Sequence, residues 1–292
     1  MSRPGWDAGG LGTTATTRAM SFAVISDIHS NLEALTTVLA DIDRRGLEQI
    51  LCLGDVIGYG ASPRQCLDLV IERCELTLCG NHDQAVFFEP FNFNPPAERA
   101  CYWTRRLFET EEDKDKRDRR WDYLGQLPVK FEANGLLFVH GSPRRPVNEY
   151  LFSDDVYTNP QKLVANFERL DGKQACFVGH THVPGVFFED PYFDPPSELT
   201  PPKLYLIGED ERVIINVGSV GQPRDRDIRA SYVVVHDAPP DDLDGATVAQ
   251  LDGEGPVVEF IRLDYDVETA VNKIHEQAEL DDFLGDRLRE GR

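Results

Sequence analysis

Five short polar motifs, each directly after an apolar and β-prone run, constrain the fold of this chain more than any other feature. The first is Asp27-Ile28-His29, which follows the run from Phe22 to Ser26. Two metal-capable side chains at positions i and i+2 of an extended backbone lie on the same side, as two ligands of one ion require. The remaining motifs are Gly54-Asp55, Gly80-Asn81-His82-Asp83, His140-Gly141 and Gly179-His180-Thr181-His182. We therefore expect several strand ends to meet around one metal-binding site.

The first three motifs belong to an alternation of strands and helices. Strands are predicted at residues 22–27, 49–53 and 75–79. A helix capped by Asn31 and ending at Gly46 joins the first two strands, and a second helix, opened by Ser62 and Pro63, joins the next two. This alternation predicts right-handed crossovers and a parallel sheet, in which a functional site lies beyond the carboxyl ends of the strands.

Residues 84–128 interrupt this pattern as an insertion between two ligand-bearing strands. The aromatic and proline-rich segment 87–96 is followed by a predicted helix at 97–108, a charged run and a helix end near residue 124. An insertion at this place can form a wall of the active-site mouth. It can equally be a pair of helices packed on one edge of the sheet, and the sequence favours neither interpretation.

The second half of the chain predicts a second sheet. Segments 129–133 and 136–140 flank Asn134-Gly135, a strong signal for a β-hairpin. A helix at 160–170 leads into a strand at 175–178, and a C-terminal helix is expected at 267–279. Further strands, mostly antiparallel, are expected near 184–188, 203–207, 212–217, 231–236 and 256–263. The predicted fold class is α/β, with two sheets packed face to face and helices outside.

The ends of the chain and its bulk composition set the expected organisation. Residues 1–20 are rich in Gly and Thr, so we expect a flexible leader followed by a single domain at 21–292. The six cysteines lie mostly in apolar runs and form no Cys-x-x-Cys pair. Free thiols and a cytoplasmic location are therefore expected.

The charge balance narrows the class of partner. The 292 residues include 30 basic and 51 acidic side chains, a formal charge of −21, which opposes binding to nucleic acid or to an anionic membrane. The chain also has no apolar run of about 18 residues, the length that a transmembrane helix needs. A small substrate is therefore favoured over a nucleic acid or a membrane, and the sequence sets no oligomeric state.

The donor atoms of the five motifs suit divalent metals that accept both oxygen and nitrogen ligands, such as manganese, iron, zinc and cobalt. The oxygen donors are Asp27, Asp55 and Asn81, and the imidazole donors are His29, His140, His180 and His182. Seven donors exceed one site, but with Asp55 shared they divide into two four-ligand sets for two ions. Such a metal pair provides a bridging hydroxide as nucleophile at neutral pH, so phosphoester hydrolysis is the expected reaction class.

Two residues that follow a predicted ligand are candidates for roles beside the metals. His82 comes directly after Asn81 and can donate a proton to the leaving oxygen, the usual task of a histidine near neutral pH. Asp83 can orient His82 or serve as a loop cap, and the sequence leaves both roles open.

Arg224 is the candidate phosphate clamp. It lies in the glycine-rich turn at residues 216–225, where backbone amides and a guanidinium can approach an anion. The competing interpretation is a surface ion pair with Asp225 or Asp227. We expect the substrate to contact Arg224, Asn81 and His82.

In this order the motifs resemble those of the calcineurin-like metallophosphoesterase superfamily. The likeness covers residues 27–182 and extends through the Gly-Ser-Val-Gly-Gln-Pro-Arg turn to about residue 236. It implies a four-layer α/β/β/α sandwich of two mixed sheets flanked by helices. It also implies one metal held by Asp27, His29, Asp55 and His182, and another held by Asp55, Asn81, His140 and His180.

Departures from the family pattern narrow the expected activity. Phosphoprotein phosphatases of this superfamily carry Gly-Asp-x-Val-Asp-Arg-Gly, whereas residues 54–60 read Gly-Asp-Val-Ile-Gly-Tyr-Gly. The missing Asp-Arg pair removes a histidine-orienting acid and a phosphate-binding arginine, which disfavours phosphoproteins. The chain looks most similar to bacterial and archaeal predicted phosphoesterases of the diadenosine tetraphosphatase-like branch.

The leading hypothesis is a dinuclear metal-dependent phosphoesterase in which a metal-bridging hydroxide attacks phosphorus in line and His82 protonates the leaving group. Monoesters, diesters and dinucleoside polyphosphates are all compatible with it. The alternatives are a non-catalytic metal-binding scaffold of the same fold, a phosphoprotein phosphatase, and a two-metal nuclease, which the charge of −21 opposes.

Overall fold

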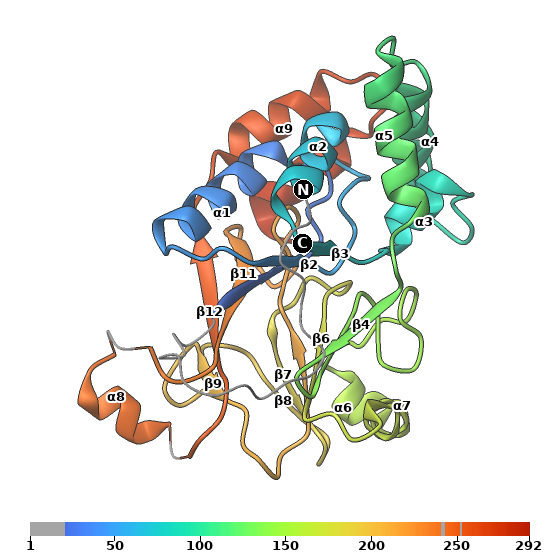
Figure 1. Ribbon diagram of the computed structural model, residues 1–292. Helices are drawn as coiled ribbons and strands as arrows, with labels where there is room; N and C mark the ends of the chain where they lie inside the picture. The colour runs from blue at the N-terminus through green and yellow to red at the C-terminus, as the bar shows by residue number, and fades with distance from the viewer. Residues whose placement is uncertain (1–20, 241–242, 252) are drawn as a thin grey trace.

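Two mixed β-sheets pack face to face at the centre of the molecule (Figure 1). The computed structural model describes residues 21–240, 243–251 and 253–292, so the leader expected at 1–20 lies outside the described residues. The first sheet has the strand order β3 (Leu76–Thr77), β2 (Ile50–Cys52), β1 (Phe22–Ile25), β11 (Ala230–His236), β12 (Val257–Leu263) and β9 (Leu204–Leu206). The second has the order β4 (Lys130–Ala133), β5 (Leu136–Val139), β6 (Ala175–Val178), β10 (Val213–Asn216), β7 (Gly185–Phe188) and β8 (Tyr192–Asp194).

The strand directions agree with the crossovers that the sequence predicts. β1, β2 and β3 are parallel neighbours in the first sheet, and β5, β6 and β10 are parallel neighbours in the second. β4 and β5 form the predicted antiparallel hairpin, in which Asn134 and Gly135 have φ values of 49° and 75°, as a two-residue turn of this kind requires. The other pairings are antiparallel, so both sheets are mixed.

Most strands are apolar on both faces, because each sheet packs on the other sheet with one face and on helices with the opposite face. In β1, Val24 belongs to the apolar cluster between the sheets, whereas Ile25 belongs to the cluster beneath the helices. Strands buried on both faces are expected to be continuously hydrophobic rather than alternating, and this explains the apolar runs that precede the motifs. The predicted α/β fold class with two packed sheets and outer helices is confirmed.

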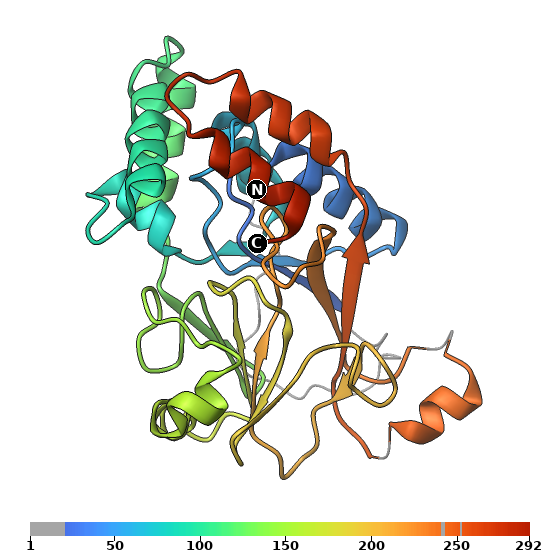
Figure 2. The same cartoon turned by 180° about the vertical axis from the view of Figure 1, so that it is seen from behind.

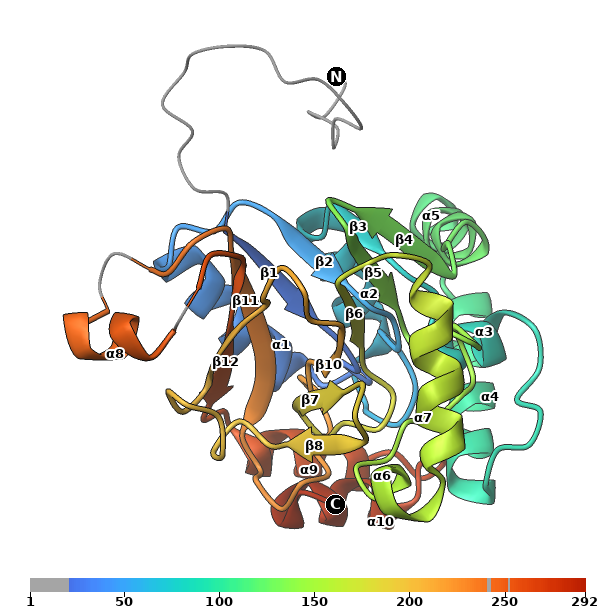
Figure 3. The same cartoon turned by 90° about the horizontal axis from the view of Figure 1, so that it is seen from below.

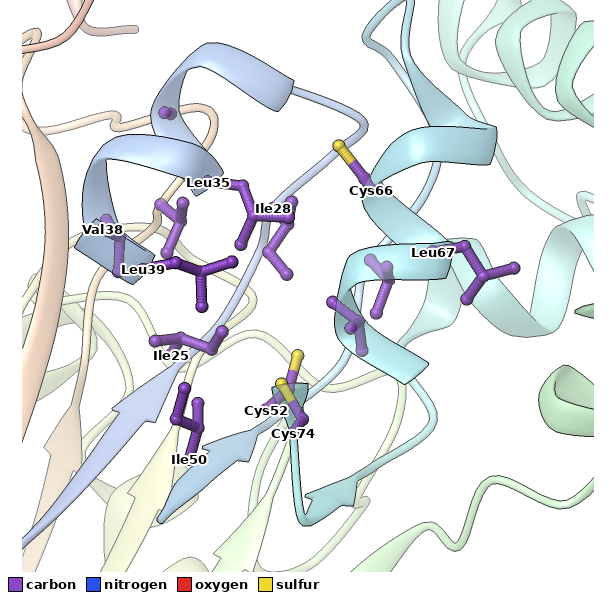
Figure 4. Close-up of a cluster of buried hydrophobic side chains, with 14 of the residues drawn as sticks. Ile25, Ile28, Leu35, Val38, Leu39, Ile50, Cys52, Cys66, Leu67 and Cys74 are labelled. Carbon is purple, nitrogen blue, oxygen red and sulfur yellow. The ribbon is translucent and has the colours of Figure 1, made fainter. Parts of the chain in front are cut away.

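Helices α1 (Leu32–Arg44) and α2 (Pro63–Arg73) cover the outer face of the first sheet (Figure 4). The side chain of Asn31 accepts a hydrogen bond from the amide three residues on and so begins α1, as predicted. In this layer Leu39 of α1 lies over Ile25 of β1, and Leu35 lies beside Ile28. Burying an aliphatic side chain of this size contributes about 1.5–3 kcal/mol to the stability of the fold. This packing therefore holds α1 and α2 against the first sheet.

The inserted segment and the C-terminal segment extend this helical layer. The inserted helices are α3 (Asn81–Phe87), α4 (Pro95–Glu109) and α5 (Lys114–Gly125), and the C-terminal ones are α9 (Val267–His275) and α10 (Asp282–Asp286), followed by the 3-10 turn η2 (Arg287–Glu290). α9 and α10 share an apolar cluster with α4, and α9 also contacts α1 (Figure 2).

The outer face of the second sheet carries the fourth layer. α6 (Asp155–Thr158), α7 (Pro160–Phe167) and the 3-10 turn η1 (Glu168–Leu170) bury apolar side chains against β5, β6, β7 and β10. The short helix α8 (Gly245–Gln250) instead projects away from both sheets (Figure 3). Among the described helices, none combines the length and the apolar character that crossing a membrane demands.

The structure differs from the prediction in three places. The strand expected at 75–79 is only the two-residue β3, because the amide of Cys79 donates to the carbonyl oxygen of Pro128 instead of continuing the ladder. The helix expected at 267–279 ends at His275, and α10 starts anew where Asp281 caps it. The short strand β8 lies between the strands expected near 184–188 and 203–207, where none was predicted.

Candidate metal centre

The seven predicted metal ligands meet at the carboxyl ends of strands from both sheets. Asp27 lies two residues past the end of β1, and His140 and His180 lie one and two residues past β5 and β6. Every one of these ligands is at least 93% removed from solvent; they are Asp27, His29, Asp55, Asn81, His140, His180 and His182. The two sheets therefore bring together side chains that are up to 155 positions apart in the sequence.

One half of the cluster gathers around Asp27. His182 Nε2 lies 3.1 Å from Asp27 Oδ1 and 3.1 Å from His29 Nε2. His29 Nε2 in turn lies 3.7 Å from Asp27 Oδ1 and 3.6 Å from Asp55 Oδ2. The donor atoms of Asp27, His29 and His182 all lie within 4.8 Å of one another, a spacing that can hold a metal ion.

The other half gathers around His140. Its Nε2 lies 3.4 Å from Asp55 Oδ2, 3.2 Å from Asn81 Oδ1 and 3.1 Å from His180 Nδ1. Asp55, His140 and His180 form a second group of donors within 4.8 Å of one another. The same oxygen, Asp55 Oδ2, therefore faces both halves.

The buried polar atoms of this centre fit cations better than they fit one another. Asp27 Oδ1 accepts no well-directed hydrogen bond, although His182 Nε2 lies 3.1 Å from it, and His180 Nε2 finds no hydrogen-bond partner among the described residues. Two pairs of imidazole nitrogens face each other at 3.1 Å, between His29 and His182 and between His140 and His180. A buried acceptor without a donor is costly, and oxygen and imidazole donors in this arrangement suit divalent metals.

The carboxylates of the centre stay charged despite their burial. Burial alone raises the pKa of Asp27, but the neighbouring His182 and His140 outweigh it and hold the pKa well below its usual range. The pKa of Asp55 is lowered for the same reason, with His140 and His82 overcoming burial. A buried negative charge needs a nearby cation, so the electrostatics of the centre also favour metal binding.

The backbone at the ligands is not extended, contrary to the prediction for Asp27 and His29. Their φ values are 54° and 47°, in the left-handed region, because β1 ends at Ile25 and the chain turns sharply after it. Asp55, His180 and His182 also have positive φ values. Such conformations cost about 1–3 kcal/mol each and persist only where the surrounding structure enforces them.

Two glycines of the motifs are explained by close approach to the ligands. A Cβ on Gly80 would lie 2.1 Å from Asp55 Oδ1, and one on Gly179 would lie 2.4 Å from Asp27 Oδ2. Both distances are too short for any side chain, so glycine is required before Asn81 and before His180. The glycines therefore allow strand ends of different segments to meet at one centre.

His82 lies in the first turn of α3 rather than in a loop at a strand end. α3 begins here because the Asp83 side chain accepts a hydrogen bond from the amide of Gly80, its N-cap. The imidazole is enclosed by Tyr59 and Phe93, with ring centroids 4.3 and 4.8 Å from its own. Burial, reinforced by nearby positive charge, lowers the pKa of His82 to about 4.

No sequence pattern indicated which residue approaches Nδ1 of His82. Cys101 of α4 places its Sγ 3.8 Å from His82 Nδ1. Burial raises the pKa of the Cys101 thiol, so the side chain is uncharged. The helical spacing of α4 identifies Cys101 only as one more apolar-face residue, and the contact depends on where the insertion packs.

The side chain of Asp83 caps both the loop after β2 and the start of α3. Its carboxylate accepts hydrogen bonds from the amides of Asp55, Val56, Ile57 and Gly80, at 2.7 to 3.3 Å. These contacts tie the loop after β2 to the start of α3. Of the two roles left open by the sequence, the structure places Asp83 in the loop-capping one.

Arg224 lies on the His182 side of the centre. Its amide donates to the carbonyl oxygen of His182, its Nη2 donates to Gln222 Oε1 at 2.7 Å, and its guanidinium carbon lies 5.9 Å from the centroid of the Tyr59 ring. The charge of Arg224 contributes to lowering the pKa of His182, after burial. Asp225 and Asp227 were the alternative ion-pair partners considered for Arg224. In the structure Asp225 pairs with Arg262 and Asp227 with Arg229.

The loop after His140 and the insertion form the mouth of the centre. Tyr150 stacks on His180 with ring centroids 3.7 Å apart and an angle of 20° between the planes. Opposite it, the insertion provides Phe93 and Cys101 beside His82, and α4 also packs on the first sheet. The inserted helices therefore do both things that the sequence suggested.

Glu149 anchors the loop after His140, and its replacement by glutamine measures how much this contributes to the stability of the fold. The carboxylate accepts hydrogen bonds from Ser142 Oγ at 2.7 Å and Asn166 Nδ2 at 3.0 Å, and it pairs with Arg144. Burial raises the pKa of Glu149, but these contacts outweigh it and lower the pKa to about 2. We expect Glu149→Gln to lower the free energy of unfolding by about 1–3 kcal/mol at neutral pH.

The pH dependence of the stability difference between the wild type and Glu149→Gln tests whether the charge of the Glu149 carboxylate causes it. Because the folded pKa lies below the unfolded value of about 4.3, the carboxylate contributes its full stability above that value and loses it as the pH falls toward 2. Denaturant titrations of both metal-free proteins should therefore show a difference that shrinks from neutral pH to about pH 3. Glu189→Gln, in an exposed pair with Arg212, is the control and should change stability by less than about 0.5 kcal/mol. A difference that stays constant with pH would contradict this assignment.

Comparisons with known proteins agree with the fold and the centre. Residues 20–238 match the model of the calcineurin-like phosphoesterase superfamily domain. An uncharacterised protein of Methanocaldococcus jannaschii is 38% identical over 277 residues, covering 92% of this chain and 98% of the relative. The crystal structure of a metallophosphoesterase from Sphaerobacter thermophilus is 33% identical, with a TM-score of 0.73 over 94% of this chain and 100% of that one.

A more distant structure supports the fold alone. A hypothetical protein from Pyrococcus horikoshii has 17% identity and a TM-score of 0.66, over 93% of this chain and 98% of that one.

The domain matched by the family model, residues 20–238, contains all seven predicted ligands, and the resemblance seen in the sequence motifs is confirmed. This chain belongs to the calcineurin-like phosphoesterase superfamily.

Proposed function

We propose that residues 21–292 form one dinuclear, metal-dependent phosphoesterase domain acting on a small phosphoester. The observation that carries the proposal is the position of Asp55, whose Oδ2 lies 3.6 Å from His29 Nε2 and 3.4 Å from His140 Nε2. A carboxylate between two donor groups is the arrangement that lets two metals share a ligand. Manganese, iron, zinc and cobalt are the metals that these donors suit.

The ligands divide between two ions with Asp55 in common. One set is Asp27, His29, Asp55 and His182, and the other is Asp55, Asn81, His140 and His180. When bound, a divalent metal pair lowers the pKa of water and withdraws charge from phosphoryl oxygens.

The remaining side chains have roles that follow from their positions. His82 protonates the leaving oxygen, and the negative charge of a phosphoryl group beside it favours its protonated form. Cys101, Tyr59 and Phe93 keep the imidazole in place. Arg224 on the His182 side balances charge that develops on the phosphoryl oxygens.

The described cysteines bear on the compartment in which this chemistry takes place. All six are free, and five of them are buried. Free thiols at every cysteine support a reducing compartment, and we propose the cytoplasm.

Metal removal and restoration test the proposed activity directly. The purified protein with Mn²⁺ should bind two ions per chain, measured by plasma mass spectrometry, and hydrolyse p-nitrophenyl phosphate or its bis ester. Dialysis against a chelator should remove both the ions and the activity, and Mn²⁺, Zn²⁺, Co²⁺ or Fe²⁺ should restore both. A protein that holds two ions but hydrolyses no mono- or diester would instead be a metal-binding scaffold.

A further inference from the structure

A cavity of about 470 Å³ opens beside the His180 half of the metal centre. Its floor contains His82, Asn81 and His180, and its walls come from the insertion and from the loop after His140. Cavities of about 300–1,000 Å³ are typical of small-molecule sites. The volume exceeds what a phosphoryl group needs, so the cavity has room for the organic part of a phosphoester.

The walls of this cavity are aromatic and amide groups. Tyr150 stacks on His180, with ring centroids 3.7 Å apart, and on Phe152, with ring centroids 5.3 Å apart and an angle of 3° between the planes. Phe91, on the loop between α3 and α4, is 82% exposed and lines the cavity. An exposed aromatic ring at the rim of a pocket is suited to stack on a planar group.

Amide side chains also line the same cavity. Three of them are Gln84, Asn92 and Asn148, which differ from the two other lining amides, Asn81 and Asn94, in making no side-chain hydrogen bond to the protein within the part of the chain that the structure describes. Each amide offers two donors and one acceptor oxygen. Their groups are therefore available for a ligand that has both donors and acceptors along its edge, as a nucleobase does.

The cavity and the opposite side of the centre differ in charge. No arginine or lysine occurs among the described residues that line the cavity, and its carboxylate, Glu89, is engaged by Arg105 and Tyr102. Arg224 does not itself line the cavity: it lies beside His182 and beside the ring of Tyr59, which borders the cavity on the side of the metal centre. Phosphoryl charge is thus matched at the metals and Arg224, whereas the cavity suits an uncharged group.

We propose that this cavity binds the nucleoside of a nucleoside monophosphate as the leaving group, an inference that rests on the proposed phosphoesterase function. In the reaction, water adds its oxygen to phosphorus and the bond between phosphorus and the nucleoside oxygen breaks. A proton from His82 goes to that oxygen, the attacking water releases one of its protons to solvent, and the nucleoside and inorganic phosphate leave. His82 then regains a proton from solvent. Dinucleoside polyphosphates are disfavoured because their additional phosphates would enter a cavity without cationic side chains.

Substrate selectivity of two phenylalanine variants tests this inference. The metal-loaded protein should hydrolyse one or more of the four common nucleoside 5′-monophosphates with a higher kcat/KM than glycerol 2-phosphate or diadenosine tetraphosphate. Phe91→Ala should lower the nucleotide-to-glycerol-phosphate ratio of kcat/KM about tenfold, as loss of one base-stacking contact predicts. Phe88→Ala removes a ring that is 64% exposed on the same segment but does not line the cavity, and it should leave this ratio unchanged.

Binding of adenosine, which has no phosphate, gives a second readout independent of turnover. In saturation-transfer NMR with the metal-free protein, the base protons should receive magnetisation, and Phe91→Ala or Asn148→Ala should reduce the signal several-fold, whereas Phe88→Ala should not. Equal kcat/KM for nucleotides and glycerol 2-phosphate, faster cleavage of diadenosine tetraphosphate, or an adenosine signal unaffected by Phe91→Ala would overturn the inference and leave the phosphoesterase proposal intact. Absence of any ester hydrolysis by the two-metal protein would overturn that proposal instead.

Discussion

Replacing Asp55 with asparagine is expected to reduce turnover of p-nitrophenyl phosphate by on the order of 10³-fold or more, because several kcal/mol of transition-state stabilisation depend on the metal pair. Asparagine keeps the Oδ1 acceptor that receives the amide of His82 at 2.7 Å. It replaces the charged Oδ2 that faces both His29 and His140. The fold should therefore persist while the bound metal falls well below two ions per chain.

Two further variants separate a shared ligand from an ordinary one. Asp27→Asn should deplete mainly one of the two ions and still cost nearly all activity, because the imidazole nitrogens that Asp27 Oδ1 approaches are those of His29 and His182. Asp41→Asn is the matched control, since Asp41 is also buried but pairs with Arg45 and Tyr232 away from the centre. It should retain both ions. An Asp55→Asn protein with two ions and wild-type turnover would refute the dinuclear assignment.

That the seven candidate ligands lie close together could be predicted from the sequence, because it follows from sheet topology. Carboxyl ends of parallel strands lie on one edge of a sheet, and Asp27, Asp55 and Asn81 follow three such strands. His140 and His180 follow parallel strands of the second sheet. A polar residue after an apolar run is therefore informative even without knowledge of the packing.

The backbone geometry of the same residues could not be predicted in this way. Asp27 and His29 were expected on an extended strand, yet both have left-handed φ values. The cause lies far away in the sequence, since Asp27 Oδ2 accepts the amide of His180 at 3.0 Å and Gly179 leaves the space for it. Local propensity disfavours these conformations, so only the assembled centre explains them.

The residues that surround the centre could be predicted from the sequence even less well. Tyr150 and Cys101 reach it from a long loop and from an inserted helix. The spacing of residues within α4 predicts which side is apolar, but not what that side contacts. The aromatic segment at 87–96 was the one available signal, and it proved to carry Phe91 and Phe93 of the cavity.

Replacing His82 with asparagine is expected to lower kcat by on the order of 10²–10⁴, the usual contribution of a general acid, while both metals remain bound. The imidazole lines the cavity assigned to the leaving group. A nitrogen of His82 lies within 4.8 Å of donor atoms of His29 and Asp55, but neither proposed ligand set includes it. The loss should depend on the leaving group. p-Nitrophenolate departs readily without a proton, whereas a nucleoside alkoxide does not, so p-nitrophenyl phosphate should be affected much less than a nucleotide.

This dependence separates proton donation from a structural role of the ring. His82 packs against Tyr59 and Phe93, and a general disturbance of that packing would reduce hydrolysis of both esters alike. His236→Asn provides a control, because His236 bonds to Ser21 and Glu259 at the C-terminal end of β11 and should change neither rate. An equal loss for both leaving groups would assign His82 a positioning role and leave the leaving oxygen to be protonated by solvent.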